Sequence, residues 1–448
     1  MSQQLSRRQF GLLALSGLGT TFLLAGCSGT GAPVSAGGST ASAIPSADAF
    51  KAATLNFEWW TNPVRTAYTN TLLQNFQQAH SAVKINAAPG EWATYWTKLS
   101  TQVAGQTEPD VIQMDQAYIA EYGGRGSLMD MSNIGSIDLT PLKSSLADGT
   151  LNGKLYGIPT GINAYGLLVN KTLFQKAGVP LPDDKTWTWN DYISTAAKLK
   201  QASGGAFTGT NWQGGDGDLQ VWLHQHGQQL YTDKGKIGFT LDNVTSWFAM
   251  VKKLFASGGS PSPDQFSNDI AASVQQTLFG TGKAAMGWAW SNQVTAFQQA
   301  SGDDVIIVRP PSVAGSASKN GIFYKPSMYW SIGAQSKYPA QAGAVINYFL
   351  NSTEAAKQQL AERGVPVNPE VLKVVKPLLS KTDQLGVQYL QDIKSEIKWV
   401  PPVPPKGTST GAAVAQRHTE DVIFARATPA AAAAGFKLEI EGLLASAS

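Results

Sequence analysis

The chain has 448 residues, a formal net charge of +3 and one cysteine. That length is large for a single hydrophobic core and predicts two lobes. Basic and acidic residues nearly balance, and no lysine or arginine cluster follows the first residues, so the charge pattern argues against a nucleic-acid partner. A single cysteine excludes an internal disulfide, so the fold must depend on its core.

The first 27 residues have the pattern of an export signal. Arg7 and Arg8 precede a weakly apolar run, 11–24, which is too short to span a bilayer as a stable helix. Paired arginines favour the twin-arginine route, which exports folded proteins. The run ends in Leu-Ala-Gly-Cys at 24–27, which resembles a bacterial lipobox. We predict a signal over 1–27 and a lipid anchor at Cys27; the alternative is a cleaved signal in which Cys27 has no role.

A segment of small and polar residues follows this cysteine. Residues 28–47 carry no charge, and their few apolar members show no period. Such a composition cannot bury enough surface to order itself. We therefore expect a flexible linker over 28–49, a folded part that begins near Phe50, and a protein held outside the cytoplasm at the cell membrane.

Strands and helices alternate from residue 54 onward. Apolar patterning indicates strands over 54–60, 83–86 and 110–114 and helices over 66–80, 93–104 and 118–122. This order predicts a parallel sheet with helices on both faces and ligand-accessible loops at the carboxyl ends of its strands. Beyond it we expect strands over 155–159, 166–170, 284–290, 305–308 and 329–334, a helical middle over 189–255, and helices over 339–350, 352–363 and 429–444.

Six short motifs stand in order along this part of the chain. They are Glu-Pro-Asp-Val-Ile at 108–112, Gly-Lys-Leu-Tyr-Gly-Ile-Pro at 153–159, Val-Asn-Lys-Thr-Leu-Phe-Gln-Lys-Ala-Gly at 169–178, Trp-Thr-Trp at 187–189, Phe-Gly-Thr-Gly-Lys-Ala-Ala-Met at 279–286 and Arg-Gly-Val-Pro-Val-Asn at 363–368. Through them the chain from residue 55 to its C-terminus resembles family 1 of the extracellular solute-binding proteins of bacterial ABC importers. That family includes the maltodextrin-binding and multiple-sugar-binding proteins.

The resemblance implies an α/β fold with two lobes, each a mainly parallel sheet flanked by helices, joined by crossing strands. It puts the crossings near 161–165, 287–290 and 331–333. The first lobe would then comprise 50–160 plus 291–330, and the second 161–290 plus 331–448. A ligand held in the cleft would close the lobes, and the permease subunits of the importer would recognise the closed form.

Thirteen tryptophans, several at the ends of expected strands, suggest the chemistry of this cleft. A pyranose has an apolar face, which an indole ring can cover, and a rim of hydroxyls, which polar side chains can bind. Together with the resemblance, this predicts ligand contacts for Trp60, Trp92, Trp288, Trp290 and Trp330, with core packing as the alternative for each. We expect core packing for Trp187, Trp189, Trp247 and Trp399.

Five further residues complete the predicted ligand site. Asn62 follows the first strand, and Asn163 and Tyr165 lie at the first implied crossing. Asp115 follows the third strand, where the family often places a hydroxyl-binding carboxylate, or it caps the next helix. Arg363 would donate paired hydrogen bonds to sugar hydroxyls, or it is a plain charge at a helix end.

A Gly-rich loop and two histidines are weaker candidates. Trp212, Gln213 and Asp216 could reach a ligand, although a solvated loop is the favoured interpretation. His224 and His226 have no third ligand nearby in the sequence, so we expect no metal site. We also expect no cofactor.

Three functions remain open from the sequence. Capture of a sugar for an importer ranks first, and the same fold carrying a glycerol phosphate, polyamine or peptide ranks second. A secreted carbohydrate-active enzyme ranks third: acidic residues that could form its pair of carboxylates are scattered along the chain, but the importer-family motifs and the two-lobe pattern argue against it. No Gly-x-Ser-x-Gly motif is present, and we predict a monomeric binding protein without catalytic activity.

Overall fold

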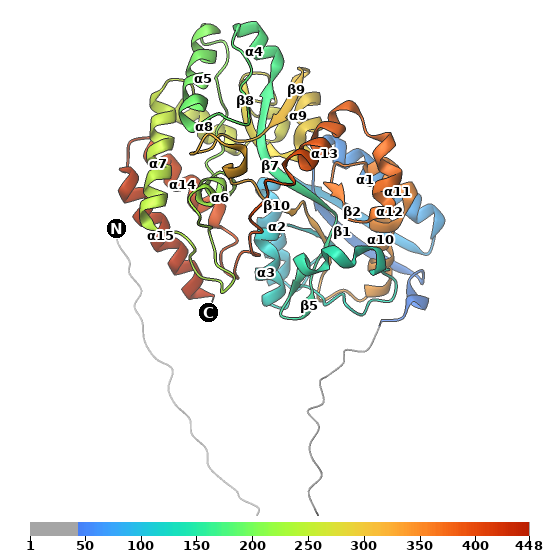
Figure 1. The fold of residues 1–448 in the computed structure, drawn as a ribbon. Coiled ribbons are helices and arrows are strands. Elements are labelled where there is room, and N and C mark those ends of the chain that lie inside the picture. Colours follow the sequence, from blue (N-terminus) through green and yellow to red (C-terminus); the bar gives the residue numbers. More distant parts are fainter. Residues whose placement is uncertain (1–43, 448) are drawn as a thin grey trace, which may run out of the picture. The chain divides into compact units, whose positions relative to one another are not determined.

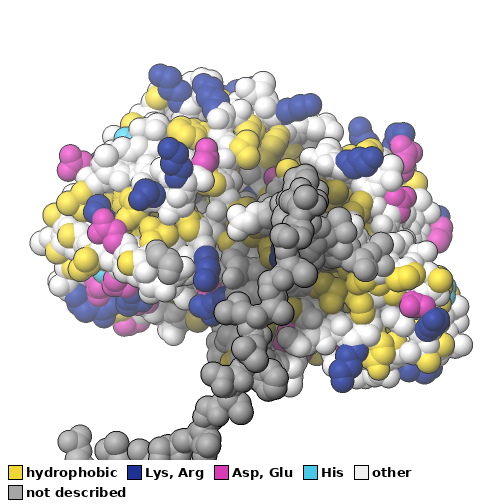
Figure 2. Space-filling view, turned by 90° about the horizontal axis from the view of Figure 1, so that it is seen from below, with side chains coloured by type: hydrophobic (Ala, Val, Ile, Leu, Met, Phe, Trp, Pro, Cys, Tyr) yellow, Lys and Arg dark blue, Asp and Glu magenta, His cyan; other side chains and the backbone are white. Residues whose placement is uncertain are grey.

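The computed structural model describes residues 44–447, so the twin arginines, Cys27 and most of the predicted linker lie outside the described residues. Among residues 44–447, no helix is long and apolar enough to cross a bilayer. On the face shown in Figure 2, basic and acidic side chains are interspersed rather than gathered by sign. The described part has α/β architecture, with two five-stranded sheets, each packed against its own hydrophobic core.

The first sheet confirms the predicted strand–helix order. Its strands run β2-β1-β3-β11-β6, and β1 is parallel to both β2 and β3. Three helices follow these strands, and the first and third begin at the side-chain caps Asn62 and Asp115. The strands are β1 (Ala53–Trp60), β2 (Val83–Gly90), β3 (Val111–Met114), β6 (Ile158–Pro159) and β11 (Tyr329–Ile332), and the helices are α1 (Pro63–Ala79), α2 (Trp92–Ala104) and α3 (Gln116–Gly124).

The second sheet is built around one long strand, β7 (Gly161–Asn170). Its first half pairs with β10 (Tyr324–Pro326) and β12 (Val365–Pro366), and its second half with β8 (Met286–Trp290) and β9 (Val305–Val308). All four pairings are antiparallel, so the expectation of a mainly parallel sheet is wrong for this lobe. The reason is that β7 carries the chain into the lobe, while β8 runs back along it.

Helices cover the second sheet on both faces. The predicted helical middle is three helices, α5 (Trp189–Ala202), α6 (Asp216–Gln225) and α7 (Leu241–Ala256). Helices from the end of the chain pack with α7 in the same core (Figure 1). The other elements are α4 (Lys171–Ala177), α8 (Pro263–Ile270), α9 (Val294–Ser301), α13 (Lys381–Ile393), α14 (Gly411–Ile423), α15 (Pro429–Ser446), and a small hairpin of β4 (Thr150–Leu151) and β5 (Lys154–Leu155).

The chain passes between the two sheets at three places. β6 in the first sheet leads directly into β7, and β10 in the second leads into β11. The third passage is at β12, between α11 (Thr353–Gln359) and α13. A crossing at 287–290 is wrong, because β8 pairs with β7 along its whole length. At the hinge a Cβ on Gly161 would lie 2.6 Å from the Gly364 carbonyl carbon, so the crossing backbones touch.

The two cores therefore do not divide at the predicted boundaries. We expect 291–330 in the first lobe, yet α9 and β9 pack against β7 in the second. Conversely, α10 (Pro339–Asn351) and α11 from the 331–448 segment pack on the first sheet, for example through Phe349. α12 (Pro369–Val375) shares a small core with α11 and α13. The first difference follows from β8, which keeps the segment after it in the second sheet, and the second follows from β11, which returns the chain to the first sheet before α10.

The folded part also begins earlier than Phe50. The Ile44 amide donates to the Asn133 carbonyl oxygen (2.9 Å), and the Gly135 amide donates to the Ile44 carbonyl oxygen (2.9 Å). Ala49 is buried against the first core. The end of the predicted linker, 44–49, is thus part of the first lobe.

Candidate functional site

Strand β7 places two of the predicted residues on one face of the second sheet. Asn163 lies opposite Lys325 of β10, and Tyr165 lies opposite Trp290 of β8. Direct cross-strand partners share a face, and so do residues two apart on a strand. The four side chains therefore stand together, and the rings of Tyr165 and Trp290 have centroids 4.8 Å apart.

Lys325 joins this face to the first lobe. Its Nζ lies 3.0 Å from Oδ2 of Asp115 and 4.5 Å from the centroid of the Trp290 ring. Oδ1 of Asp115 accepts a hydrogen bond from the Ala117 amide (2.9 Å). Asp115 therefore caps α3 through one oxygen, while its other oxygen faces the second lobe.

A second carboxylate approaches from α6 of the second lobe. Burial raises the pKa of Asp216, while Lys325 counteracts this rise and Asp115 adds to it. Burial also raises the pKa of Tyr118 on α3, and the charges of Asp115 and Asp216 raise it further. A Cβ on Gly217 would lie 3.1 Å from Cζ of Tyr165, so the start of α6 adjoins this face, and Asp216, which we interpret from sequence as part of a solvated loop, is half-buried beside it.

The first lobe contributes a cluster of aromatic rings. Trp60 at the end of β1 meets Trp92 edge to face, with centroids 5.2 Å apart, and Trp92 is 46% exposed. Trp96 and Tyr118 stack at 3.5 Å with 5° between their planes. Trp96 and Tyr118 are not among the residues predicted from the sequence to bind ligand, although Trp96 lies four residues after Trp92 and therefore on the same helix face.

Two of the predicted ligand contacts lie in the cores instead. Trp330 is 1% exposed, between Phe57 (4.9 Å) and Phe349 (5.3 Å). Trp288 is 3% exposed, and its Nε1 donates to the Tyr192 hydroxyl (3.1 Å). The cleft prediction is wrong for both rings, because Phe349 of α10 packs against Trp330, and Trp189 and Tyr192 of α5 pack against Trp288. Of the four tryptophans expected to pack in the core, Trp187, Trp189 and Trp247 are buried, and Trp399 is half-buried.

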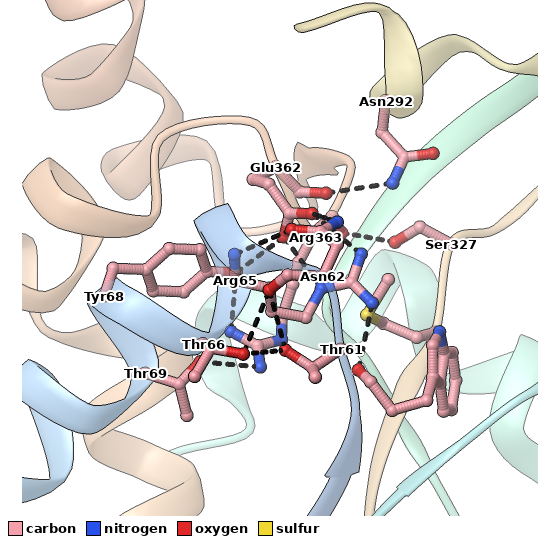
Figure 3. Close-up of polar contacts among 12 residues, drawn as sticks. Thr61, Asn62, Arg65, Thr66, Tyr68, Thr69, Asn292, Ser327, Glu362 and Arg363 are labelled. Carbon is pink, nitrogen blue, oxygen red and sulfur yellow. Dashed lines mark hydrogen bonds and ion pairs between the residues drawn. The ribbon is translucent and has the colours of Figure 1, made fainter. Parts of the chain in front are cut away.

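Asn62 and Arg363, also predicted to bind ligand, take part in a buried polar network at the hinge (Figure 3). Asn62 donates to Oε1 of Glu362 (2.8 Å), and Arg65 forms an ion pair with the same carboxylate (2.8 Å). Arg363 donates to Gln113, Tyr68 and Thr69 at 2.6–3.0 Å, and its guanidinium carbon lies 5.0 Å from the Trp330 ring centroid. Burial lowers the pKa of Arg363 to about 10. These side chains hold the lobes' crossing segments rather than face the site.

Asn163 has one oxygen left without a partner. Its amide nitrogen donates to Oδ1 of Asn292 (2.9 Å), and Asn292 donates in turn to the Glu362 carbonyl oxygen (2.9 Å). Oδ1 of Asn163 is buried and accepts no hydrogen bond within the described residues. A buried acceptor in this position is suited to a donor from outside the chain.

Other places in the described residues carry less chemistry. A surface hollow of about 690 Å³ beside Phe50, Phe76 and His80 is lined by the first lobe alone, so it cannot join two lobes. His224 stacks on Trp399 (4.6 Å), and burial lowers its pKa to about 4. The described residues contain no group of three His, Cys, Asp or Glu side chains placed to bind a metal ion.

Comparisons with known proteins show the family to which this chain belongs. Residues 71–385 match the profile of the bacterial extracellular solute-binding proteins. The chain is 24% identical over 367 residues to an uncharacterized lipoprotein of Streptomyces antibioticus. That alignment covers 78% of this chain and 75% of the lipoprotein. This chain is also 24% identical over 219 residues to a diacetylchitobiose binding protein of Streptomyces coelicolor. That alignment covers 47% of this chain and 50% of the Streptomyces coelicolor protein.

A solved structure shows the same fold. The oligogalacturonide binding protein of Yersinia enterocolitica, in complex with saturated digalacturonic acid, superposes with a TM-score of 0.79 at 21% identity, over 88% of this chain and 99% of the other. The family match covers more than half of the 448 residues. The chain therefore belongs to the bacterial extracellular solute-binding proteins, and its role is to bind a solute.

Proposed function

We propose that this protein captures a sugar or oligosaccharide between its lobes and delivers it to the permease of an ABC importer. The observation that carries the proposal is the link Asp115–Lys325–Trp290, which brings a carboxylate of one lobe and an aromatic ring of the other to one ammonium group. Rings and carboxylates together fit the apolar faces and hydroxyl rim of a pyranose. The proposed contacts are Trp60, Trp92, Trp96, Asp115, Tyr118, Asn163, Tyr165, Asp216 and Trp290.

Two relatives support a carbohydrate cargo. The Yersinia enterocolitica structure holds digalacturonic acid, and the Streptomyces coelicolor relative is named for diacetylchitobiose. Sugars of different charge and linkage are therefore accommodated among proteins similar to this one.

The arginines argue against a phosphate cargo. Arg65 is paired with Glu362, and Arg125 with Glu121 (2.7 Å). Arg363 is held by Gln113, Tyr68 and Thr69. An anionic cargo would need free cations in the cleft, and these three are committed to partners in the chain.

A thermal-shift screen against mono- and oligosaccharides tests the proposal. A ligand at one hundred times its dissociation constant stabilises the folded state by roughly 2.7 kcal/mol, which is readily seen as a higher Tm. The panel should include a polyamine, glycerol 3-phosphate and short peptides. A shift with one of these and with no sugar would replace carbohydrate with another cargo.

We also propose binding without turnover. The protein is incubated with a sugar that shifts its Tm, and the mixture is analysed by mass spectrometry over several hours. Unchanged sugar is the expected result, whereas product that accumulates in proportion to protein concentration would make this chain an enzyme.

A further inference from the structure

The site between the lobes is rich in acceptors and has one basic side chain at its centre. Asp115 contributes a carboxylate oxygen, Asn163 an unpaired Oδ1, and Trp290 the electron-rich face of its ring. Lys325 supplies the ammonium group that faces both Asp115 and Trp290. These contacts indicate which sugars the arrangement selects, and that inference rests on the proposed function, the capture of a sugar.

Lys325 covers the part of Trp290 on which a sugar would stack. The other neighbours of this ring are Tyr165, tilted at 4.8 Å, and Phe323, edge-on at 5.9 Å. The backbone of Lys325 is fixed, because β10 pairs with residues Ile162 to Ala164 of β7. A sugar ring can therefore stack on Trp290 only when the Lys325 side chain swings away.

Displacement of the ammonium would leave a second acceptor without a donor. Oδ2 of Asp115 would lose its ion pair, and Oδ1 of Asn163 already has no donor. Buried acceptors without partners are costly, so the incoming ligand must donate hydrogen bonds to them. Once Lys325 has moved, a ligand carboxylate would meet the carboxylate of Asp115, a like charge.

We propose that Lys325 holds the place of a donor group of the ligand, so that the cleft selects basic and uncharged sugars over acidic ones. An amine of the sugar would replace the lysine ammonium between Asp115 and Trp290, and a hydroxyl would do so without charge. The acidic cargo of the Yersinia enterocolitica structure, which shares the fold at 21% identity, then does not carry over to this chain.

Calorimetric titration of the full-length protein with matched sugars tests the selection. The probes are glucose, glucosamine and glucuronate, and the β-1,4-linked disaccharides cellobiose, chitobiose and cellobiouronic acid. Within a set, the amino and neutral sugars should bind about tenfold or more tightly than the uronic one, because like charges in a partly buried site repel. A uronic sugar bound as tightly as its neutral counterpart overturns the inference and leaves sugar capture standing. If none of the sugars binds, both the inference and the proposed capture of a sugar are wrong.

Two variants separate place-holding from direct binding by Lys325. Lys325→Met keeps the length of the side chain and frees the carboxylate, so it should tighten binding of the amino sugar several-fold and weaken the uronic sugar further. Lys319→Met, an exposed lysine in the same segment, is the control and should leave all affinities unchanged. Equal weakening of all three sugars by Lys325→Met would show that the lysine itself binds the ligand, and would overturn the inference.

Discussion

Two tryptophans with the same predicted role, Trp290 and Trp330, lie in opposite environments. Trp290 is partly exposed beside Lys325, whereas Trp330 is packed between Phe57 and Phe349. Trp290→Ala should weaken ligand binding by about 1–3 kcal/mol through lost apolar contact and leave unfolding little changed. Trp330→Ala should instead lower the free energy of unfolding by about 3–5 kcal/mol. Calorimetric titration and urea unfolding of both variants check this, and loss of stability without loss of affinity in Trp290→Ala would contradict it.

A buried carboxyl beside the site should make stability depend on pH. Burial raises the pKa of Asp218 to about 7, although hydrogen bonds from the Tyr165 hydroxyl (2.5 Å) and the Gly214 amide (2.7 Å) act to lower it. Burial likewise raises the pKa of Asp269 to about 6. A folded pKa above the unfolded value means that the native state binds more protons between the two values. The free energy of unfolding should therefore fall as pH rises from about 4 to about 7.

Asp218→Asn removes this ionisable group, so the free energy of unfolding should depend less steeply on pH. The dependence that is due to Asp269 should remain. Urea unfolding at pH 4, 5, 6 and 7 measures it. A variant with the parent's slope would mean that Asp218 titrates normally.

At the scale of elements, the hinge depends on Glu362. Its carboxylate accepts from Asn62, Arg65 and Tyr68 at 2.8–2.9 Å. Burial alone would raise its pKa, but the charge and hydrogen bonds of Arg65, the charge of Arg363 and the hydrogen bond from Asn62 together outweigh burial and lower the pKa. Glu362→Gln leaves Arg65 buried without a counter-charge, so it should lower the free energy of unfolding by about 3–5 kcal/mol.

Glu354→Gln is the matched control for this variant. Glu354 pairs with Lys357 at 2.7 Å, but both side chains are exposed, so the change should cost less than about 1 kcal/mol. Urea unfolding measures both variants, and equal effects would contradict a special role for the hinge network.

The elements also show what sequence patterning can and cannot predict. β1, β3 and their helices follow from periodicity and caps, because each signal is local. The direction of β8 does not, since a strand of the same composition can run back along β7 or leave the sheet. Short motifs identify the family, but they do not tell which lobe the helices after β8 join.

The site residues show the same limit. A ring at a strand end suits a cleft and a core equally, so Trp290 cannot be told from Trp288, two residues before it on the same face of β8, without knowing how far the helices extend over that face. Lys325 lies on a strand of three residues, which is too short for a periodic pattern to identify it as a site residue. Only the pairing with β7 brings it to Asn163 and Trp290.

At the scale of the whole molecule, we propose that the protein is anchored through an acylated Cys27. The lipobox-like sequence supports this, and the Streptomyces antibioticus relative is named a lipoprotein. Cys27→Ala should move the protein from the membrane fraction into the soluble fraction, since acyl chains would supply the attachment. Fractionation followed by immunoblotting measures it, with Ser28→Ala as the control. Full membrane retention of Cys27→Ala would rule the anchor out.

The residues of the two cores alternate along the chain, and this determines when each core can fold during synthesis. The first core draws on residues from Ala49 to Ala355, and the second on residues from Tyr165 to Ile440. Neither can be completed until residues near Ala355 have left the ribosome, because each needs contacts between segments far apart in sequence. A nascent chain of 300 residues would expose apolar faces of both, a state prone to aggregation. Chaperone demand should therefore peak late in synthesis, and the first core should be completed before the second, which also needs Ile440.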